Sequence, residues 1–433
     1  MTPRPPFADD LKLSPYWWDD VPRPTLPPSP PPPKSDVVVI GSGYTGLAAA
    51  LQTARGGRHT VVLDAHDAGF GCSTRNGGQI STSVKHGYAA LAQRFGADRA
   101  VRLVKEGQNS LAWVGAFIKE EGIDCDFRIA GRFHAAHHPA RYQALAQALA
   151  AQPRGLEVAA HMVPRAEQAT ELGTDIYHGG ILYEHHASVH PARFHQGMLD
   201  RVQQAGATVI PHCLATAIDR DGSTFRVACS GGIIAARNVV VATNGYTGRL
   251  TPWLRRRVIP IGSYIIATEP IAAATMERLM PRGRVVSDTR KVVYYYRPSP
   301  DNRRILFGGR VSYDETDPRR SGPPLHAEMV RIFPDLADVQ ISHSWAGFVA
   351  YTFDEMMHTG ERDGLFYAMG YCGSGVGMAG YLGTRIGQQV LRRGEGATAF
   401  DNLPLESRPY YWGNPWFLAP SVAYYRWKDR SGH

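Results

Sequence analysis

Short hydrophobic runs alternate with helical patterns along the first half of the chain. The run 36–40 is mostly β-branched and short, which predicts a buried parallel strand. An alanine- and leucine-rich helix is expected from 47 to about 55, and 59–63 predicts a second strand that ends in Asp64. Together these segments predict a βαβ unit. Apolar residues at helical spacing predict further helical regions at 88–121, 140–152 and 190–204.

The second half repeats these patterns and adds a new one. Buried-strand runs occur at 207–210, 214–218, 238–242 and 364–370, with a hairpin expected over 224–235. A glycine-rich turn after the last run leads into a helix expected over 381–393. Between 258 and 311, apolar and polar residues alternate within the segments 262–268, 291–297 and 304–309. This period of two is typical of a half-exposed antiparallel sheet and indicates a second domain.

Both termini depart from the pattern of the body. Twelve of the first 34 residues are proline, which predicts a stiff polyproline arm. The arm also carries Tyr16, Trp17 and Trp18, and three adjacent aromatic residues favour an arm that docks on the body over a disordered tail. The segment 406–433 is rich in Trp and Tyr and is expected to form a docked C-terminal wrap.

Composition narrows the class of protein. A chain of 433 residues can build a large core without disulfides, and it contains no run of about 18 apolar residues that would predict a membrane span. The five cysteines are scattered and show no CxxC spacing, so we expect reduced thiols and a cytoplasmic protein. The formal charge of +8 is spread along the chain, so we expect an anionic small molecule and no nucleic-acid partner.

The 17 histidines do not predict a metal site. Two adjacent pairs, 137–138 and 185–186, would point apart on a helix or strand, and no HExxH motif is present. His343 and His358 flank Trp345 and could line a pocket, although an imidazole satisfied by its surroundings is the alternative.

A glycine-rich turn joins the first predicted strand to the first predicted helix. Gly41 permits the tight turn, Gly43 lets the backbone approach a pyrophosphate, and Gly46 lets helix and strand pack closely. The helix N-terminus presents free N–H groups to phosphate, and Asp64 can accept hydrogen bonds from a ribose. We therefore expect dinucleotide binding, with candidate residues Gly41, Ser42, Gly43, Tyr44, Thr45, Gly46 and Asp64.

Two later loops favour FAD over NAD. The loop directly after the second strand is made of small residues and one arginine, and it can run under a pyrophosphate toward an isoalloxazine ring. A second glycine-rich turn near 375 also joins a strand to a helix, whose N–H groups would face the flavin pyrimidine. These loops add the candidates Gly71, Ser73, Thr74, Arg75, Asn76, Gly77, Gly78, Gln79, Gly373, Ser374, Gly375, Val376, Gly377 and Met378.

With these motifs the sequence resembles the FAD-dependent amine oxidoreductases of the D-amino-acid oxidase, glycine oxidase and sarcosine oxidase group, and within it the γ-glutamylputrescine oxidoreductase branch. The resemblance covers most of the chain, from residues 16–18 through 40–47, 75–79 and 242–247 to 345–347 and 370–380. It adds the cofactor-binding candidates Ala65, Ala215, Thr243, Asn244 and Gly245.

The resemblance implies an α/β fold in which a Rossmann-like FAD-binding domain joins a substrate domain built on a mixed, largely antiparallel sheet. The expected boundaries are 1–34 for the arm, 35–95, 186–258 and 345–405 for the FAD-binding domain, 96–185 and 259–344 for the substrate domain, and 406–433 for the wrap. It also implies oxidation of a C–N bond by hydride transfer from the α-carbon of a neutral amine to flavin N5, followed by imine hydrolysis and reoxidation by O2.

Three positions differ from relatives in the group. Some relatives attach FAD to a cysteine, where this sequence has Val349, and others attach it to a histidine, where it has Arg75. We therefore expect FAD held without a covalent bond. Sarcosine oxidases keep a lysine that promotes reaction with O2, and the corresponding position here falls near Leu306.

The substrate-side candidates are Arg75, Tyr295 and Arg310. On an alternating strand Tyr294 and Tyr296 share one face and Tyr295 lies on the other, so one face can form an aromatic wall for an amine or simply pack in the sheet. Either arginine could clamp a carboxylate or add positive charge near the flavin, and a solvated surface position is the alternative for Arg310.

The leading hypothesis is an FAD-dependent oxidase of a small amine or amino acid that releases peroxide. A dehydrogenase that passes electrons to a carrier or quinone is the alternative. A flavin-binding subunit without turnover and an NAD-dependent dehydrogenase are more distant possibilities. Which amine is oxidised, its chirality, the oligomeric state and the role of the arm stay open.

Overall fold

The computed structural model describes residues 5–27, 29–309 and 317–431, and these residues form two large sheets. The nine-stranded sheet is mixed and largely antiparallel, with parallel pairing only where β1 meets β17 and β14 meets β5. Its strands, in spatial order, are β1 (Phe7–Lys12), β17 (Ile341–Tyr351), β13 (Ile259–Thr268), β16 (Ile305–Gly309), β15 (Tyr295–Pro298), β14 (Val285–Asp288), β5 (Arg132–Ala135), β7 (Gly180–Tyr183) and β6 (Ala160–Val163).

The second sheet has eight strands within the described residues and a parallel centre. Its strands are β10 (Ala215–Asp221), β11 (Thr224–Cys229), β12 (Gly232–Val241), β2 (Lys34–Ile40), β3 (Thr60–Leu63) and β9 (Thr208–Ile210), with β19 (Leu365–Met369) beside β12 and β18 (His358–Arg362) beside β19. A short pair joins β4 (Gln79–Ile80) to β8 (Ala187–Ser188). The combination of these sheets with helices confirms the predicted α/β class.

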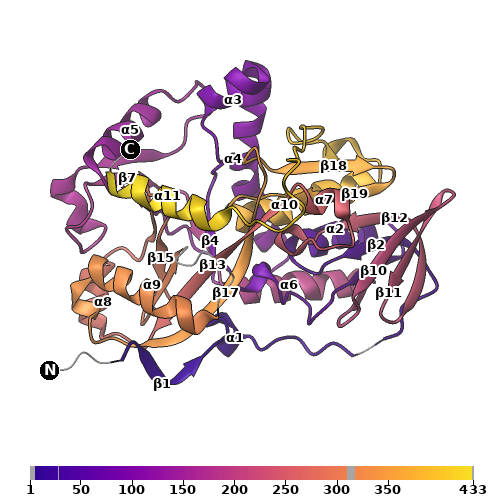
Figure 1. Cartoon of the computed structure of the whole chain (residues 1–433), viewed down its shortest axis with the longest axis horizontal. Coiled ribbons are helices and arrows are strands. Elements are labelled where there is room, and N and C mark those ends of the chain that lie inside the picture. Colours follow the sequence, from indigo (N-terminus) through magenta and orange to yellow (C-terminus); the bar gives the residue numbers. More distant parts are fainter. Residues whose placement is uncertain (1–4, 28, 310–316, 432–433) are drawn as a thin grey trace.

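The parallel strands are buried on both faces, which explains their continuous hydrophobic runs. On β2, Val37 and Val39 pack in the cluster that contains the helices, while Val38 and Ile40 pack in the cluster on the opposite face. Figure 1 shows the helical layer beside this sheet, and the nine-stranded sheet with its own helices lies at the other side of the molecule. The long helices packed in the first cluster are α2 (Tyr44–Arg55), α4 (Ala97–Glu120), α6 (Pro191–Gln204) and α10 (Gly375–Val390), and α3 (Tyr88–Phe95) packs beside them through Leu91.

The remaining helices cover the periphery. Two of them, α8 and α9, pack on the nine-stranded sheet, and α5 lies against β6 and β7. Their bounds are α1 (Trp17–Asp20), α5 (Pro139–Ala150), α7 (Pro252–Arg255), α8 (Ala273–Leu279), α9 (Pro318–Ile332) and α11 (Leu418–Ser431). Among the described residues, no helix combines the length and the hydrophobicity that crossing a membrane requires.

Several predicted elements need correction. The helical region expected over 88–121 is two helices, because Gly96 adopts a φ of +81° between α3 and α4. The predicted strands 232–235 and 238–242 are one strand, β12, which pairs first with β11 and then with β19. The helix expected from 381 begins at Gly375, where small residues let α10 approach α2 closely: a Cβ on Gly383 would lie 2.3 Å from the Thr45 carbonyl oxygen.

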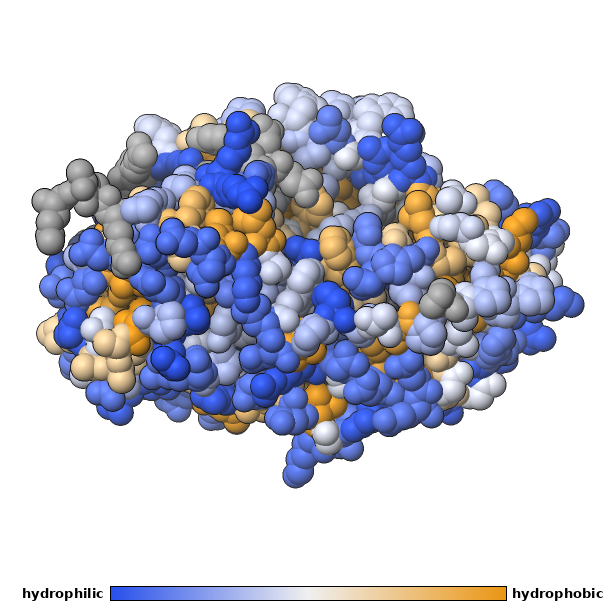
Figure 2. Space-filling view, turned by 90° about the horizontal axis from the view of Figure 1, so that it is seen from below, coloured by the Kyte–Doolittle hydropathy of each residue, from blue (hydrophilic) through white to orange (hydrophobic). Residues whose placement is uncertain are grey.

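The N-terminal arm docks on the body, as predicted. It contributes β1, which pairs in parallel with β17, and α1, and the sequence pattern indicated neither element. Trp17 is fully buried beside Leu306 and Trp345. The lower face of the molecule, which carries the arm, is mainly hydrophilic with small scattered hydrophobic patches (Figure 2).

The C-terminal segment is docked at two points. Tyr411 is buried and donates a hydrogen bond to the Val258 carbonyl at 2.6 Å. Asp429 on α11 accepts hydrogen bonds from the backbone amides of Lys291 and Val292. Figure 1 shows α11 crossing the front of the molecule in yellow. The predicted domain boundaries stay a proposal, and the boundary at residue 345 falls inside β17.

Candidate active site

A cavity of about 1250 Å³ lies where the carboxyl ends of β2 and β3 meet one face of the nine-stranded sheet. Ile40, Gly41, Leu63 and Asp64 line one end, and the residues 347–351 of β17 line its middle. Ligand pockets for one small molecule commonly measure about 300–1,000 Å³. The volume therefore accommodates a large cofactor together with a substrate.

The first glycine-rich turn brings a helix terminus to this cavity. Gly41 has a φ of +101°, and a Cβ on Gly46 would lie only 1.9 Å from the Gly41 carbonyl oxygen. The helix α2 follows with Gly43 at its N-cap and no side-chain cap. Its Tyr44 amide donates to Ser73 Oγ at 2.9 Å. Because the remaining first-turn amides have no capping side chain, the turn presents donors and a positive dipole end to the cavity.

Asp64 closes this end of the cavity. Its Oδ2 accepts hydrogen bonds from the Ser42 amide at 2.9 Å and from Ser42 Oγ at 2.5 Å, and its Oδ1 accepts one from the His66 amide at 3.0 Å. These three bonds hold the carboxylate in one orientation at the end of β3. Both lone pairs of Oδ2 are therefore engaged, and Oδ1 can still accept one further hydrogen bond from a ligand.

The 71–79 loop forms one wall, and tryptophan side chains hold it from behind. Trp17 Nε1 donates to the Asn76 carbonyl and Trp345 Nε1 to the Arg75 carbonyl, both at 2.8 Å. Trp18 Nε1 donates to Thr74 Oγ1 at 3.1 Å. The backbone of the loop is therefore anchored to the arm and to β17 at adjacent residues.

Arg75 lines the cavity, although much of its guanidinium is already engaged. Its Nε donates to the Phe70 carbonyl at 2.7 Å and its Nη1 to the Ala346 carbonyl at 3.3 Å. The guanidinium lies over the rings of Trp18, at 4.7 Å, and Phe70, at 4.4 Å. Burial lowers its pKa from the ordinary arginine value. These contacts fix the positive charge of Arg75 at the cavity wall.

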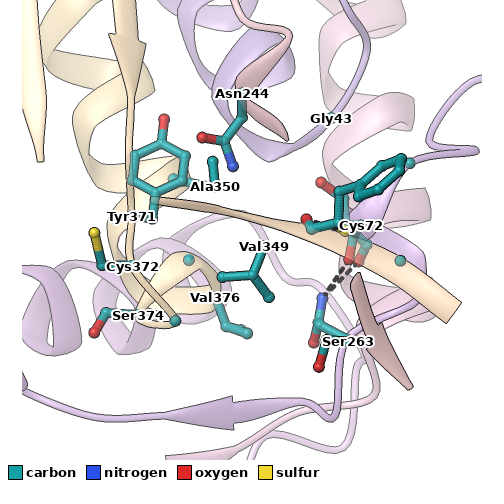
Figure 3. Close-up of a pocket in the computed structure, with 18 of the residues that line it drawn as sticks. Gly43, Cys72, Asn244, Ser263, Val349, Ala350, Tyr371, Cys372, Ser374 and Val376 are labelled. Carbon is teal, nitrogen blue, oxygen red and sulfur yellow. Dashed lines mark hydrogen bonds between the residues drawn. The ribbon is translucent and has the colours of Figure 1, made fainter. Parts of the chain in front are cut away.

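The glycine-rich turn before α10 forms the opposite wall. Gly370 and Gly373 have φ values of +78° and +100°, and the Gly370 amide donates to Asn244 Oδ1 at 3.0 Å. α10 begins at Gly375 and has no side-chain cap, so a second helix terminus opens on the cavity. In Figure 3 the Val349 side chain lies between this turn on one side and Ser263 and Cys72 on the other. The segments near residues 41, 75 and 375 thus converge, as the sequence predicted.

The cavity also holds a thiol. Cys72 Sγ donates to the Phe348 carbonyl at 2.7 Å. Burial raises the pKa of this thiol to about 11, so Cys72 is neutral near pH 7 and is a poor nucleophile. Val349 and Arg75, the positions at which some relatives carry a covalent attachment, both line the cavity and supply no cysteine or histidine.

The structure separates the predicted residues into two groups. The cavity is lined by Gly41, Gly43, Tyr44, Thr45, Asp64, Ala65, Gly71, Ser73, Arg75, Asn76, Gly77, Gln79, Ala215, Thr243, Asn244, Gly373, Ser374, Gly375, Val376 and Tyr295. The second group lies outside the lining and includes Ser42, Gly46, Thr74, Gly78, Gly245, Gly377 and Met378. Arg310 lies outside the described residues.

The three consecutive tyrosines lie on the two faces of the sheet, as predicted. Tyr295 faces the cavity, with its hydroxyl 2.9 Å from Ser263 Oγ. Tyr294 and Tyr296 point to the other face and stack on Phe307, with ring centroids 5.6 and 5.3 Å away. A Cβ on Gly77 would lie 3.2 Å from the Tyr295 ring, so this ring touches the 71–79 loop.

The two histidines near Trp345 do not line the cavity, so the alternative interpretation holds for both. His343 Nε2 lies 3.0 Å from Asp19 of the arm, and His358 Nε2 lies 3.0 Å from Asp354. No three His, Cys, Asp or Glu side chains in the described ranges are arranged to hold a metal ion.

The sequence did not predict the residues that line the far end of the cavity. Arg132 and His134 on β5, Arg141 on α5 and Ser287 on β14 line it. The alternation of polar and apolar residues over 132–135 was the available signal, but it does not identify which sheet or which face the strand would join.

Comparison with known proteins agrees with this geometry. Residues 36–389 match the family model described as DAO, FAD dependent oxidoreductase. The chain is 32% identical over 415 residues to the probable oxidoreductase OrdL of Rhizobium meliloti (strain 1021), covering 94% of this chain and 95% of that protein. It is 31% identical over 402 residues to the gamma-glutamylputrescine oxidoreductase of Escherichia coli (strain K12), covering 92% and 93%.

Solved structures show the same fold. The crystal structure of glycine oxidase from Geobacillus kaustophilus superimposes with a TM-score of 0.73 at 20% identity, covering 88% of this chain and 100% of that chain. The L-proline dehydrogenase from P. horikoshii superimposes with a TM-score of 0.70 at 19% identity, covering 90% and 99%.

Proposed function

The chain belongs to the DAO family of FAD-dependent oxidoreductases, and we propose that it is an oxidase of a small amine or amino acid. The family and its relatives identify the chain as an FAD-dependent oxidoreductase that acts on amines or amino acids. In the oxidase reaction the amine loses hydride from its α-carbon, the imine is hydrolysed, and O2 reoxidises the flavin with release of peroxide. The scattered cysteines, all five of them free thiols, also support a cytoplasmic location.

The residues around the cavity fit FAD. Two helix N-termini without side-chain caps open on one cavity, and backbone N–H groups of this kind bind anionic pyrophosphate and electron-rich ring edges. Asp64 is positioned to accept from a ribose hydroxyl through Oδ1, and Arg75 adds a fixed positive charge. With Val349 and Arg75 at the attachment positions of relatives, FAD is held without a covalent bond.

When bound, FAD supplies a hydride acceptor at N5 of its isoalloxazine ring. The protein's part is to position the amine and to exclude water. Tyr295 and Ser263 form a wall beside the 71–79 loop, and their mutual hydrogen bond holds the tyrosine ring in place. An aromatic face at this position can orient an amine through cation–π attraction before it loses its proton.

One observation carries the proposal: the three glycine-rich segments near residues 41, 75 and 375 line a single cavity that continues past Tyr295. To test it, the purified protein is first examined for bound FAD by its absorption spectrum. Anaerobic bleaching of the flavin is then screened with polyamines, γ-glutamylputrescine, N-methyl amino acids and D- and L-amino acids. Bleaching by one class, with peroxide formed under air, supports the oxidase. A flavin that no amine bleaches contradicts it.

A dehydrogenase is the second candidate, and one position favours it. Leu306, near the position at which sarcosine oxidases keep their lysine, is buried beside Trp17 and Trp345. The chain therefore offers no amino group at that position to promote reaction with O2. Reoxidation that is slow in air and fast with a quinone or dye acceptor would identify this alternative.

A further inference from the structure

Exposed aromatic side chains gather in the C-terminal segment. Twelve large hydrophobic side chains are exposed in the described part of the chain, and six of them lie between residues 410 and 427. Neighbouring rings of this group contact each other: the ring centroids of Tyr410 and Trp416 are 6.2 Å apart, and those of Tyr424 and Trp427 are 6.1 Å apart. The six residues, which are 41–63% exposed and which we call the aromatic patch, are Tyr410, Trp412, Trp416, Tyr424, Tyr425 and Trp427.

The helix α11 presents an apolar face to solvent. Pro420, Ala423, Tyr424 and Trp427 recur at the spacing of one helix face, and all four are exposed. The helix is held to the body by Asp429, which accepts hydrogen bonds from the backbone amides of residues 291 and 292. A helix on the surface of a soluble protein normally turns its apolar face inward, so this orientation indicates a docking surface for something outside the chain.

The segment before α11 joins the aromatic patch to a basic turn at the end of α7. The guanidinium of Arg256 lies over the Trp412 ring, 3.8 Å from its centroid. Next to this pair, a Cβ on Gly413 would lie only 2.5 Å from the Arg255 side chain. The aromatic patch and the two arginines therefore belong to one surface.

The two segments that form this surface carry an excess of positive charge. Residues 247–268, which include α7, contain four arginines and neither Asp nor Glu. Residues 406–431 contain four Lys or Arg residues against two acids. One of these acids, Asp429, already binds two backbone amides, and the other, Glu406, pairs with Arg408 at 2.7 Å. The surface therefore combines exposed Trp and Tyr side chains with a net positive charge.

This combination matches the headgroup region of an anionic bilayer. Trp and Tyr have an apolar ring and a polar N–H or O–H group, and they concentrate where a bilayer meets water. An interfacial helix lies flat with its apolar face in the lipid, and Lys and Arg beside it are attracted to anionic headgroups. A second copy of the chain fits less well, because a two-fold contact would bring the arginines at the end of α7 in both copies together.

We propose that the aromatic patch, together with Arg255 and Arg256, docks the protein on the surface of an anionic phospholipid bilayer. The Trp and Tyr rings enter the headgroup layer, and the two guanidinium groups contact lipid phosphates. At the base of the patch Tyr411 packs in one cluster with Tyr351 and Cys372, which line the cavity. The docking surface therefore lies directly behind one wall of the cavity. The proposal does not depend on which amine the protein oxidises.

Co-sedimentation of the FAD-loaded full chain with lipid vesicles tests the proposal. One set of vesicles is made of phosphatidylcholine alone, and the other contains one third phosphatidylglycerol. We expect at least tenfold tighter binding to the anionic vesicles, because each Lys or Arg near an anionic membrane surface strengthens binding about fivefold. Added salt should weaken this binding, since it screens the attraction between the charges. Equal binding to both sets of vesicles, or binding to neither, would overturn the proposal.

Surface variants locate the contact. The double variant Trp416→Ser/Trp427→Ser should bind anionic vesicles at least tenfold more weakly, because burying one large apolar side chain contributes about 10- to 100-fold. Arg256→Gln should weaken the binding about fivefold. Ile129→Ser and Arg154→Gln remove an exposed apolar side chain and an exposed charge outside the patch, so they should bind like the wild type. The flavin absorption spectrum checks that each variant is folded. Patch variants that bind like these controls would refute the assignment.

Self-association through the same patch is distinguished by analytical ultracentrifugation without lipid. A wild-type dimer that the double variant converts to a monomer, with no binding to either set of vesicles, would assign the patch to a second copy of the chain and overturn the proposal. Vesicle binding that the double variant loses, while its sedimentation without lipid stays that of the wild type, supports docking on a bilayer.

Discussion

Replacing Trp17 by phenylalanine tests whether the N-terminal arm holds the 71–79 loop in its binding conformation. Trp17 is fully buried, and its Nε1 donates to the Asn76 carbonyl at 2.8 Å. Phenylalanine keeps most of the buried ring but removes this donor. A buried acceptor left without its partner costs about 1–3 kcal/mol.

That cost falls on the loop that lines the cavity. Each 1 kcal/mol changes an equilibrium about fivefold, and the apparent affinity for a ligand falls with the fraction of molecules in the binding conformation. We therefore expect W17F to raise the Kd for FAD about fivefold or more. W17A should have a larger effect, because truncating a buried tryptophan costs about 3–5 kcal/mol.

The assay is titration of the apoprotein with FAD, followed by quenching of flavin fluorescence. Trp345→Phe removes the parallel bond to the Arg75 carbonyl and should behave similarly. Because both bonds restrain the same loop, the double variant should weaken FAD binding less than the product of the two single effects. Trp427→Phe is the matched control, since this side chain is 62% exposed. Kd values for W17F and W345F within twofold of this control would refute the anchoring role.

Three further changes test the site. Asp64→Asn should raise the Kd for FAD about tenfold, because an amide cannot accept from Ser42 and a ribose as the carboxylate does; unchanged FAD binding would remove Asp64 from the site. Gly46→Ala should abolish soluble FAD-loaded protein, since its Cβ would lie 1.9 Å from a backbone oxygen, whereas Gly248→Ala meets nothing within 4 Å and should express normally. Burial lowers the pKa of His195 to about 3. Below pH 6.5 the unfolded chain therefore binds a proton at this histidine and the folded chain does not. The free energy of unfolding falls as the pH falls below 6.5, by about 1.4 kcal/mol per pH unit, down to the folded-state pKa. His195→Gln should therefore flatten the decrease of Tm between pH 6.5 and 4, and an unchanged slope would contradict this.

The local sequence pattern predicted correctly those features that depend only on residues close together in the chain. The run 36–40 is β-branched because both faces of β2 are buried, and Gly41 is glycine because its φ of +101° and the nearby Ala242 carbonyl exclude a side chain. The alternation that places Tyr295 opposite Tyr294 and Tyr296 is likewise a local property of a strand. These features lie within a few residues of one another, so periodicity alone predicts them.

Long-range contacts decided the rest. No local pattern indicates that Trp17 donates to Asn76, 59 residues later, or that the arm adds a strand beside β17. The extent of β12 depends on two different partners, β11 and β19. In the sequence, Arg132 does not differ from any other polar residue of a strand. Only the order of the strands, with β5 two strands beyond β15, shows that it lines the cavity. The sequence by itself determined the strand and turn chemistry of the nucleotide-binding end, whereas the far end of the cavity emerged only when packing brought separate strands and α5 to one space.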